Sequence, residues 1–583
     1  MIKPFLTFLI AVAGLLFSTA RPAAPAPQNC GTPATAIHQI QGSGSHSPLA
    51  GQTVSIEGIV TYASGHKDGF NGFYIQQADA EADNDAATSE ALFVYTRHKA
   101  NPGQRLRLTG RVKEFHDLTE LVKVSQLTVC GREPLPEPIK LSLPWPQSPE
   151  SLENMRVSFD APLTVIEHHN LAVFGELTLA REDQIIPTEH LKPGAHAARQ
   201  ARSNLENRVL LDDGKSARNP RPIPWLQLGD DHTVRAGDTV TGVSGVLDYR
   251  FGQWRVQPEQ PPKFSRPQPR PEPLPKSSDD VIRVMALNLQ NYFNGDGGRG
   301  GYPTPRGAKN AKAHQHQTRR LVTAIKLADP DIVAVTELEN DGYDPRSSLA
   351  QLTRALGSSW RFIKTPNQDG SDAIRTALLF RNDRVKPEGK ALRLNEGIYT
   401  DRGRPPLAQT FGPVTGGKSL RVVVPHLKSK SCRNAHEANS DQQDGQGCFS
   451  AYRTREAQAI TRWLSNLSTP KNLAGTLITG DLNSYARETP VDTFRKAGFT
   501  SLVHRTHPCT PGDCRYHSYR YRGEKGSLDY ALATRTLIPH AASTSIWNIN
   551  ADEPRALNYQ SAPDRSGPWR ASDHNPVITD LQL

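Results

Sequence analysis

Apolar and polar residues alternate along the first part of the chain. The alternation has a period of two over residues 54–60, 72–76 and 105–112, which is typical of half-buried β-strands. Short strands at this spacing predict a small β-barrel of the OB type over residues 30–135.

One stretch of this first region returns later in the chain. Residues 102–112 resemble residues 236–246, and aromatic residues follow both copies, Phe115 in the first and Tyr249, Phe251 and Trp254 in the second. The similarity predicts a second OB-like domain over residues 136–262. OB barrels often bind single-stranded nucleic acid through basic grooves and stacking aromatics. They also occur as spacers or lids, and the pattern leaves both roles open.

The pattern changes after a proline-rich stretch. Residues 263–279 carry a proline at every second position from 267 to 275, which predicts a stiff, extended linker. Beyond it, continuous apolar runs at 281–287, 332–335, 376–380, 420–424, 476–479 and 528–531 predict buried strands, and residues 319–327, 455–464 and 491–497 have helical spacing. This alternation predicts an α/β layered domain over residues 280–583.

The first residues have the organisation of an export signal. Lys3 precedes an apolar run over residues 5–17, and Ser18-Thr19-Ala20 supplies small residues for cleavage. The run is too short to span a bilayer comfortably. We therefore expect a signal peptide over residues 1–20, a secreted or periplasmic protein and no stable membrane anchor. An uncleaved anchor is the alternative.

The cysteines agree with export. The chain has six of them, an even number, and disulfides persist in oxidising compartments. Their positions suggest the pairs Cys30–Cys130, Cys432–Cys448 and Cys509–Cys514. Six cysteines allow fifteen pairings, so this connectivity is one choice among many. None of the spacings is typical of a zinc site.

The charge of the chain favours a polyanionic partner. The net charge is +10 and the isoelectric point is about 9.2, which suits nucleic acid. A diffuse excess of positive charge with no ligand is the alternative, and the sequence indicates no oligomeric state.

Polar side chains lie at the ends of the strands of the α/β region. They are Asn288, Glu337, His426 and Asp481 with Asn483, which end or follow apolar runs, Asp529, which lies in the run at 528–531, and Asp573 with His574, which come just before the last strand. Strands of one rigid sheet can aim such side chains into a common cleft. Taken one at a time, these residues also fit turns, helix caps or surface charges, so the argument rests on their joint occurrence.

Five segments in this order resemble the endonuclease/exonuclease/phosphatase superfamily, whose fold is that of deoxyribonuclease I. Within that superfamily, the segments are most similar to those of the secreted bacterial extracellular nucleases. The segments are Asn288-Leu289-Gln290-Asn291-Tyr292-Phe293, Thr304-Pro305-Arg306-Gly307-Ala308, Gly370-Ser371-Asp372-Ala373-Ile374-Arg375, His426-Leu427-Lys428-Ser429-Lys430 and Gly480-Asp481-Leu482-Asn483. The resemblance covers residues 280–583. It implies a four-layer α/β sandwich preceded by one or two small OB-like β-barrels.

The resemblance also implies a metal-dependent hydrolysis of phosphodiesters. Glu337 corresponds to the principal carboxylate ligand of the metal, with Asn288 and Asp573 near it. Oxygen donors of this kind suit Mg²⁺, and also Mn²⁺ or Ca²⁺. Where repair-type members carry an Asp, this chain has Gln290, which leaves one carboxylate fewer for a second ion.

The other residues receive catalytic or phosphate-binding roles by the same resemblance. Asp481 orients or deprotonates the attacking water, Asn483 holds the phosphate, and His574 contacts the phosphate while Asp529 fixes its tautomer and charge. His426 is an acid or a phosphate ligand near the leaving group. Arg375 and Arg453 are candidate phosphate clamps.

Three functions follow from these expectations. The first is an exported nuclease acting on extracellular DNA, or on RNA. The alternative keeps the catalytic domain but changes the substrate to a phospholipid or another small phosphoester. A membrane-reading enzyme should carry exposed apolar loops, and none is evident in the sequence. A binding protein that has lost activity is the third, but none of the expected site residues is missing.

Overall fold

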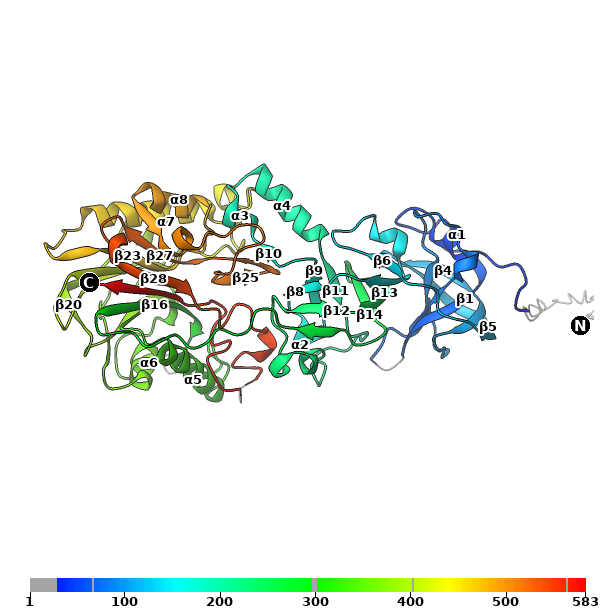
Figure 1. The fold of residues 1–583 in the computed structure, drawn as a ribbon, viewed down its shortest axis with the longest axis horizontal. Helices are drawn as coiled ribbons and strands as arrows, with labels where there is room; N and C mark the ends of the chain where they lie inside the picture. The colour runs from blue at the N-terminus through cyan, green and yellow to red at the C-terminus, as the bar shows by residue number, and fades with distance from the viewer. Residues whose placement is uncertain (1–28, 66–67, 296–300, 401–402, 563–564) are drawn as a thin grey trace, which may run out of the picture.

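The chain forms three successive regions along one long axis (Figure 1). The protein is described here from a computed structural model, which covers residues 29–65, 68–295, 301–400, 403–562 and 565–583. The expected signal peptide over residues 1–20 therefore lies outside the described residues. Within the described ranges, no helix is long and apolar enough to cross a membrane.

The first region is a closed five-stranded barrel. Its strands are β1 (Thr53–Ser64), β2 (Gly72–Gln76), β3 (Ala91–Tyr95), β4 (Gln104–Phe115) and β5 (Leu118–Arg132), in the order β1-β2-β3-β5-β4. A two-residue turn at His116 and Asp117, both with positive φ, joins β4 to β5, as tight hairpins require. The Cys30–Cys130 disulfide ties the chain before β1 to β5. The barrel expected over residues 30–135 is present.

The second region has the same order of strand pairing as the first barrel, with some of its strands interrupted. Its nine strands have the order β15-β12-β8-β9-β11-β14-β13-β7-β6. The strands are β6 (Ile139–Leu141), β7 (Arg156–Phe159), β8 (Leu163–Glu167), β9 (Leu177–Ala180), β11 (Val209–Leu211), β12 (Thr239–Thr241), β13 (Val243–Arg250), β14 (Gln253–Pro258) and β15 (Lys263–Ser265). The repeated segment is continuous in β4, whereas Gly242, at φ 73°, divides the second copy into β12 and β13. The two halves of this strand pair with β8 and β7 on one side, and β13 pairs with β14 on the other. The pairings β8-β9, β9-β11 and β11-β14 complete the circuit, so these strands form a second five-stranded barrel.

The third region is the expected α/β domain, built around two six-stranded sheets. The first has the order β18-β19-β17-β16-β29-β28 and the second β20-β21-β22-β23-β27-β24. The first comprises β16 (Val281–Tyr292), β17 (Ile332–Glu339), β18 (Trp360–Phe362), β19 (Ile374–Arg381), β28 (Ala541–Ile546) and β29 (Val577–Gln582), and the second β20 (Val385–Arg393), β21 (Leu407–Pro413), β22 (Ser419–Val424), β23 (Leu473–Asp481), β24 (Phe499–Ser501) and β27 (Asp529–Thr534).

Helices cover the outer face of each sheet and make four layers. The helices α5 (Ala311–Ala328) and α6 (Ser348–Leu356) cover the first sheet, and α7 (Ser450–Asn466) and α8 (Thr489–Lys496) cover the second (Figure 1). In β17, Ala334 faces the core between the sheets, whereas Val333 and Val335 face α5 and α6. Burial on both faces explains why these strands are continuous apolar runs in the sequence.

The proline-rich stretch is packed against the α/β domain. Arg270 forms a bidentate ion pair with the buried Glu553, at 2.8 and 2.6 Å. The indole Nε1 of Trp547 donates to the carbonyl of Glu272 at 3.1 Å. The predicted linker therefore holds the second and third regions in a fixed relation.

A small shared sheet joins the second region to the α/β domain. The strand β10 (Gln184–Ile185) pairs in parallel with β26 (Glu524–Gly526), which pairs with β25 (Tyr519–Tyr521). Beside it, Arg520 lies between Asp183 of the second region and Asp552 of the α/β domain, at 2.6 and 2.9 Å. These buried charges lie directly at the joint between the two regions.

A further anchor comes from the helix α3 (Pro187–His190). The buried carboxylate of Glu189 accepts hydrogen bonds from the backbone N–H groups of Ala486 and Ser527 and contacts His504 Nε2 at 2.7 Å. Glu189 thereby connects the second region to the α/β domain, because all three of these partners belong to the α/β domain.

Replacing Asp552 by Asn tests the importance of the charged joint. Burial opposes the ionised carboxylate, but the charges of His517 and Arg520 outweigh it and hold the pKa of Asp552 well below its usual range. Removing one partner of a buried ion pair costs about 3–5 kcal/mol, so we expect the free energy of unfolding at pH 7 to fall by about 3 kcal/mol or more. Urea unfolding measures it.

The pH dependence of this loss has a definite sign. Because the pKa of Asp552 is depressed in the folded protein, its contribution is present above the unfolded value of about 3.9 and disappears as the pH falls through the folded value. Wild type and Asp552→Asn should therefore converge in strong acid. Asp160→Asn is the control, since its ion pair with Lys140 is exposed and contributes less than about 1 kcal/mol. Equal stability of wild type and Asp552→Asn at pH 7 would contradict the assignment.

Candidate active site

The polar residues at the strand ends of both sheets converge at one end of the sandwich. Asn288 lies on β16 of the first sheet, and its Nδ2 donates to Asp481 Oδ2, at the end of β23 of the second sheet, over 3.3 Å. His426 follows β22, and its Nε2 lies 3.5 Å from the same carboxylate oxygen. Asp529 begins β27 and contacts His574, which precedes β29, at 2.7 Å. The cluster therefore joins the two sheets.

Irregular backbone aims several of these side chains. The pairing of β16 with β17 shifts after Asn288, and the pairing of β17 with β19 shifts around Glu337. Gln290, Glu337 and Asn483 have φ values of 54°, 56° and 46°, a region that non-glycine residues seldom occupy. Bulges redirect side chains near functional sites, and strained residues of this kind cluster there.

A charged histidine lies at the centre of the cluster. Burial opposes the charged form of His574, but the carboxylate of Asp529 outweighs it and, with Asp481 and Asp573, raises the pKa of His574 to about 10. The ring of Tyr519 packs against the imidazole at 4.5 Å. Since Nδ1 faces Asp529, the other ring nitrogen, Nε2, is the one left to donate to a ligand.

The carboxylate of Asp481 is held by amides on both sides. Its Oδ1 accepts from the backbone N–H of Asn483 at 2.7 Å, and its Oδ2 accepts from Asn288. Burial and the nearby charge of Asp529 raise the pKa of Asp481 to about 7, against the opposing effect of His574. A carboxylate with such a pKa can exchange a proton near neutral pH.

His426 is a neutral imidazole in this environment. Burial, followed by the charges of Arg404 and His574, lowers the pKa of His426 well below its usual value. The side chain is only 2% exposed, and its Nδ1 has no hydrogen-bond partner among the described residues. These conditions favour a neutral contact to Asp481 and not the acid role that the resemblance offers for His426.

Glu337 and Asp573 form a pair of neighbouring carboxylates whose charges His574 offsets only in part. Burial and then the charge of Asp573 raise the pKa of Glu337, whose Oε2 accepts from the backbone N–H of Asn291 at 2.9 Å. In the described part of the chain, no lysine or arginine forms an ion pair with Glu337 or Asp573. With Asn288, they supply the oxygen donors that a hard divalent cation prefers, and such an ion would relieve their repulsion. The residues therefore fit the expected metal.

Two other groups of side chains place potential ligand atoms close together. Asp481, Asp529 and His574 have such atoms within 4.8 Å of one another, as do His38, Asp83 and Glu90 in the barrel. His574 is a poor ligand here, since metal binding requires a neutral imidazole and its pKa is about 10. Glu337, Asn288 and Asp573 are the better candidates at the active site.

The two predicted phosphate clamps do not offer their guanidinium groups to solvent. Arg375 is fully buried, pairs with Asp369 at 3.2 Å and lies over the ring of Tyr343. Arg453 is also fully buried and donates to Ser484 Oγ at 3.1 Å and to the carbonyl of Cys448 at 2.7 Å. The geometry gives both arginines structural roles in place of the expected one. Arg453 supports the turn that follows Asp481.

The three expected disulfides are present in the structure. Cys30–Cys130, Cys432–Cys448 and Cys509–Cys514 have S–S distances of 1.97, 2.04 and 2.02 Å. The carbonyl of Cys448 accepts a hydrogen bond from Arg453. The second disulfide therefore reinforces the loop beside the turn at Asn483.

Two further arginines, Arg404 and Arg306, lie near the site. Arg404 is 8% exposed and donates to the backbone carbonyls of His426 and Leu427. Arg306 is partly exposed, pairs with Asp372 at 3.4 Å and contributes to the low pKa of His426. Arg306 lies in the family-like segment over residues 304–308, so the sequence could have predicted its place near the site. Arg404 lies in none of the family-like segments.

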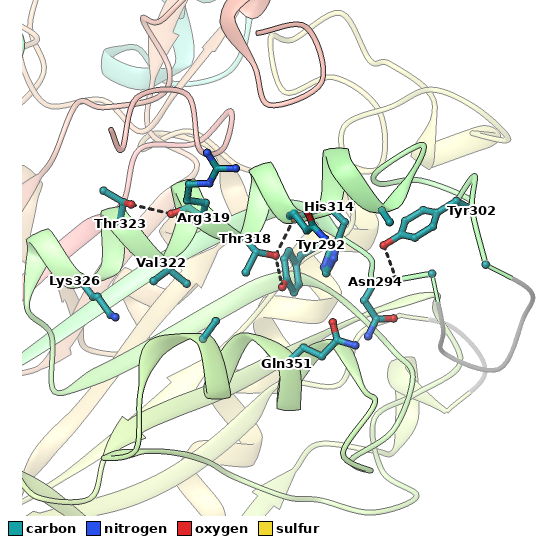
Figure 2. A pocket seen from close by; sticks show the side chains of 15 residues that line it. Tyr292, Asn294, Tyr302, His314, Thr318, Arg319, Val322, Thr323, Lys326 and Gln351 are labelled. Carbon is teal, nitrogen blue, oxygen red and sulfur yellow. Dashed lines mark hydrogen bonds between the residues drawn. The ribbon is translucent and has the colours of Figure 1, made fainter. Parts of the chain in front are cut away.

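The cavity between α5 and α6 is separate from this cluster. It has a volume of about 850 Å³, and Figure 2 shows Tyr292, His314, Thr318 and Gln351 around it. The hydroxyls of Tyr292 and Thr318 bond to each other at 2.8 Å, and Thr318 also donates to the carbonyl of His314. None of the clustered carboxylates or histidines lines this cavity, so it has no part in the chemistry.

Comparisons with known proteins agree with the fold of the third region. Residues 285–574 match the model of the Endonuclease/Exonuclease/phosphatase family, and residues 148–266 match a Domain of unknown function (DUF8508). No curated protein matches the chain.

Solved structures with similarity to the chain cover 52% of it. The human Nocturnin catalytic domain is 18% identical over 94% of its own length, with a TM-score of 0.34. A mannosyl-6-phosphatase of Bacteroides thetaiotaomicron is 16% identical over 100% of its length, with a TM-score of 0.36. TDP2 of D. rerio, complexed with a single-strand DNA product, is 16% identical over 99% of its length, with a TM-score of 0.34.

Substituting Asp529 by Asn tests the charge state of His574. We expect the wild-type imidazole to stay protonated up to about pH 10. In Asp529→Asn it should lose its proton at a lower pH, because the neutral amide removes the charge that outweighs burial. Selective ¹⁵N labelling of histidine and an NMR titration measure this.

The control for this titration is Asp513→Asn. Asp513 is an exposed carboxylate in the turn between Cys509 and Cys514, and its loss should leave the His574 titration unchanged. A wild-type His574 that titrates near its ordinary value of about 6.5 would show that the ion pair with Asp529 does not govern the site.

Proposed function

Taking residues 285–574 as a domain of the endonuclease/exonuclease/phosphatase family, whose members hydrolyse phosphoester bonds, we propose that this protein is an exported, metal-dependent nuclease that cuts phosphodiester bonds of extracellular DNA. One observation carries the proposal: the charged His574 and the Asp481 carboxylate lie in one buried cluster beside the oxygen donors Glu337, Asn288 and Asp573. Phosphodiester hydrolysis needs each of these parts, namely a cation for the phosphate, a base for water and donors for a metal.

His574 binds the phosphate in this proposal. Its Nδ1 is engaged by Asp529, so Nε2–H donates to a non-bridging phosphate oxygen. The charged imidazole stabilises the negative charge that grows on the phosphate in the transition state. Asp529 is a positioning residue, because it keeps His574 protonated and oriented without touching the substrate.

Asp481 orients the attacking water and accepts its proton. The amide groups of Asn288 and Asn483 hold its two oxygens in place, and its pKa of about 7 suits a base at neutral pH. Asn483 also donates from Nδ2 to the carbonyl of Leu427 at 3.0 Å. This fixes the plane of the amide for contact with the phosphate.

Three oxygen donors form the proposed metal site. Glu337, Asn288 and Asp573 would hold Mg²⁺ or a similar ion, which supplies charge neutralisation at the phosphoryl and leaving oxygens. Asn291 N–H binds one oxygen of Glu337 and leaves the other for the ion. Without an ion these carboxylates repel one another, so the metal-free site has an excess of negative charge.

The substrate and the location rest on charge and on the cysteines. The net charge of +10 favours a polyanion, and all six cysteines are disulfide-bonded, which fits an oxidising, exported environment. A small phosphoester or a phospholipid is the alternative substrate, and the same catalytic groups would serve it.

Cleavage of supercoiled plasmid by the purified mature protein tests the proposal. We expect nicking with Mg²⁺ and none with EDTA. His574→Ala should lose activity by about a hundredfold or more, since general acid–base and charge-stabilising groups contribute on this order. His46→Ala, an exposed histidine on the barrel region, should keep wild-type activity.

The outcome separates the proposal from its alternative. Folded wild-type protein that cuts neither plasmid, linear DNA nor RNA would refute a nuclease. Hydrolysis of choline phospholipids or sugar phosphates by that same preparation would then support the small-phosphoester alternative.

Glu337→Gln tests the metal assignment without an activity assay. Isothermal titration calorimetry with Mn²⁺ should show an affinity at least about tenfold lower than in wild type, because the principal charged ligand is gone. Asp344→Asn, an exposed carboxylate on the loop before α6, should bind Mn²⁺ as wild type does.

The unfolding temperature of metal-free Glu337→Gln is an independent test of the raised pKa of Glu337. Because the folded-state pKa of Glu337 is raised, the ionised carboxylate destabilises the folded protein above its unfolded pKa. The variant should therefore unfold at an equal or higher temperature than wild type in EDTA at pH 7. Unaltered Mn²⁺ affinity would exclude Glu337 as a ligand.

A further inference from the structure

A second cleft lies between the nine-stranded sheet and the α/β domain. It has a volume of about 840 Å³. One wall comes from the loop Glu167–Asn170 after β8, and the other includes Tyr519, Arg570 and Asp573 of the candidate active site. Tyr519 packs on His574, so the cleft opens directly onto the catalytic cluster.

The two walls of this cleft are held in a fixed position. Arg520 lines the cleft and is locked between Asp183 and Asp552, one from each region. Arg208 donates from Nη1 to the carbonyl of Arg522 at 2.8 Å across the same joint. His168 Nε2 lies 3.1 Å from the carbonyl of Asp552, which anchors the loop that carries His169. A preformed cleft needs little ordering when a ligand binds.

Several cations on the walls are not neutralised by carboxylates. Among the described residues, Arg522, Arg555 and Arg570 form no ion pair. Arg522 and Arg555 are exposed, whereas Arg570 is 8% exposed and donates to the carbonyl of Asn550. By contrast, Arg520 is fully paired. Arg522 and Arg555 therefore present their charges on the side of the cleft that faces solvent.

His169 and Arg555 come from the two different walls and meet at the rim. The Nη1 of Arg555 lies 3.3 Å from His169 Nδ1. Both side chains are exposed, so an anionic group can reach both donors at once. A joint contact of this kind depends on the second region as much as on the α/β domain.

An exposed aromatic ring completes the surface. Tyr521 is 49% exposed, lines the cleft and lies beside the guanidinium of Arg522 at 5.4 Å. Bases of single-stranded nucleic acid stack on such rings while nearby cations bind the backbone. A small phosphate ester lacks the further phosphates and bases that a strand would offer to such a surface.

We propose that this cleft binds the nucleic-acid strand next to the scissile phosphate, with Arg522, Arg555 and His169 on the backbone and Tyr521 against a base. This inference rests on the proposed nuclease function and deepens it. The nine-stranded sheet is then part of the substrate site, and the enzyme prefers polynucleotides to small phosphodiesters because only a strand fills the cleft.

Steady-state cleavage of oligonucleotides and of bis(p-nitrophenyl) phosphate tests the inference with the full mature chain. For oligonucleotides of about ten nucleotides, Arg522→Ala and Arg555→Ala should each raise KM about tenfold or more. Each should also reduce the slope of log KM against the logarithm of the salt concentration by about one unit, because one phosphate contact is lost. The loss in kcat/KM for the small diester should be at least about tenfold smaller than the loss for the oligonucleotide.

Lys140→Ala and Arg535→Ala are the matched controls. Lys140 is exposed on the edge strand β6 of the nine-stranded sheet, and Arg535 is exposed after β27, at the end of that strand opposite to Asp529. Both controls should behave as wild type toward both substrates. Thermal unfolding of all four variants confirms that they fold, since the substituted side chains are exposed.

The results distinguish the two proposals. Equal losses on both substrates, or no loss on the oligonucleotide, would overturn the cleft assignment while leaving the nuclease function intact. A wild-type protein that hydrolyses the small diester but no nucleic acid would overturn both. Selective loss on the oligonucleotide supports both.

Discussion

A single charged imidazole balances the carboxylates of the candidate active site. His574 lies against Asp529 at 2.7 Å, and the charges of Asp481 and Asp573 add to the effect that raises its pKa to about 10. Without that cation, the buried carboxylates would repel one another with less compensation, which Arg404 and Arg570 would then supply from further away. The same charge lowers the pKa of His426 and opposes the rise at Asp481. One ion pair thereby sets the protonation of its neighbours.

The backbone must be fixed on several sides for this balance to hold. Glu337 and Asn483 occupy positive φ within irregular ends of their strands, and such conformations persist only where the surroundings enforce them. Arg453 supplies part of the support, because it joins Ser484 to the loop that ends at the Cys432–Cys448 disulfide. The second region supplies more through Glu189, which binds the backbone of Ala486 and Ser527. The second region therefore stabilises the loop after Asp481 and the loop before Asp529.

The sequence predicted the α/β layers and most of the cluster for identifiable physical reasons. Strands buried on both faces, such as β17, are continuous apolar runs. Asn288 and Asp481 end such runs, and His574 comes just before β29. The suggested cysteine pairs, one choice among fifteen, are those of the structure, and each pair lies at the ends of a local segment or of one barrel.

Features that depend on side-chain direction or on long-range pairing were not predictable. Arg375 stands in a family segment, but its guanidinium turns inward to Asp369, and spacing does not report that direction. The interruption of one strand of the second region at Gly242, between β12 and β13, was not apparent from the pattern either. The pairing of Gln184 with Glu524 joins residues far apart in the sequence, and no local pattern encodes it.

In the proposed mechanism, the oxygen donors beside His574 hold a metal at the point where a phosphodiester is cut. A crystal structure of the protein with Mn²⁺ and a hydrolysis-resistant phosphorothioate oligonucleotide would test this arrangement. We expect an anomalous peak within about 2.0–2.6 Å of oxygens from Glu337, Asn288 or Asp573, with a phosphate of the strand against His574. An ordered strand whose phosphates avoid His574, or a manganese peak bound only by other residues, would contradict it.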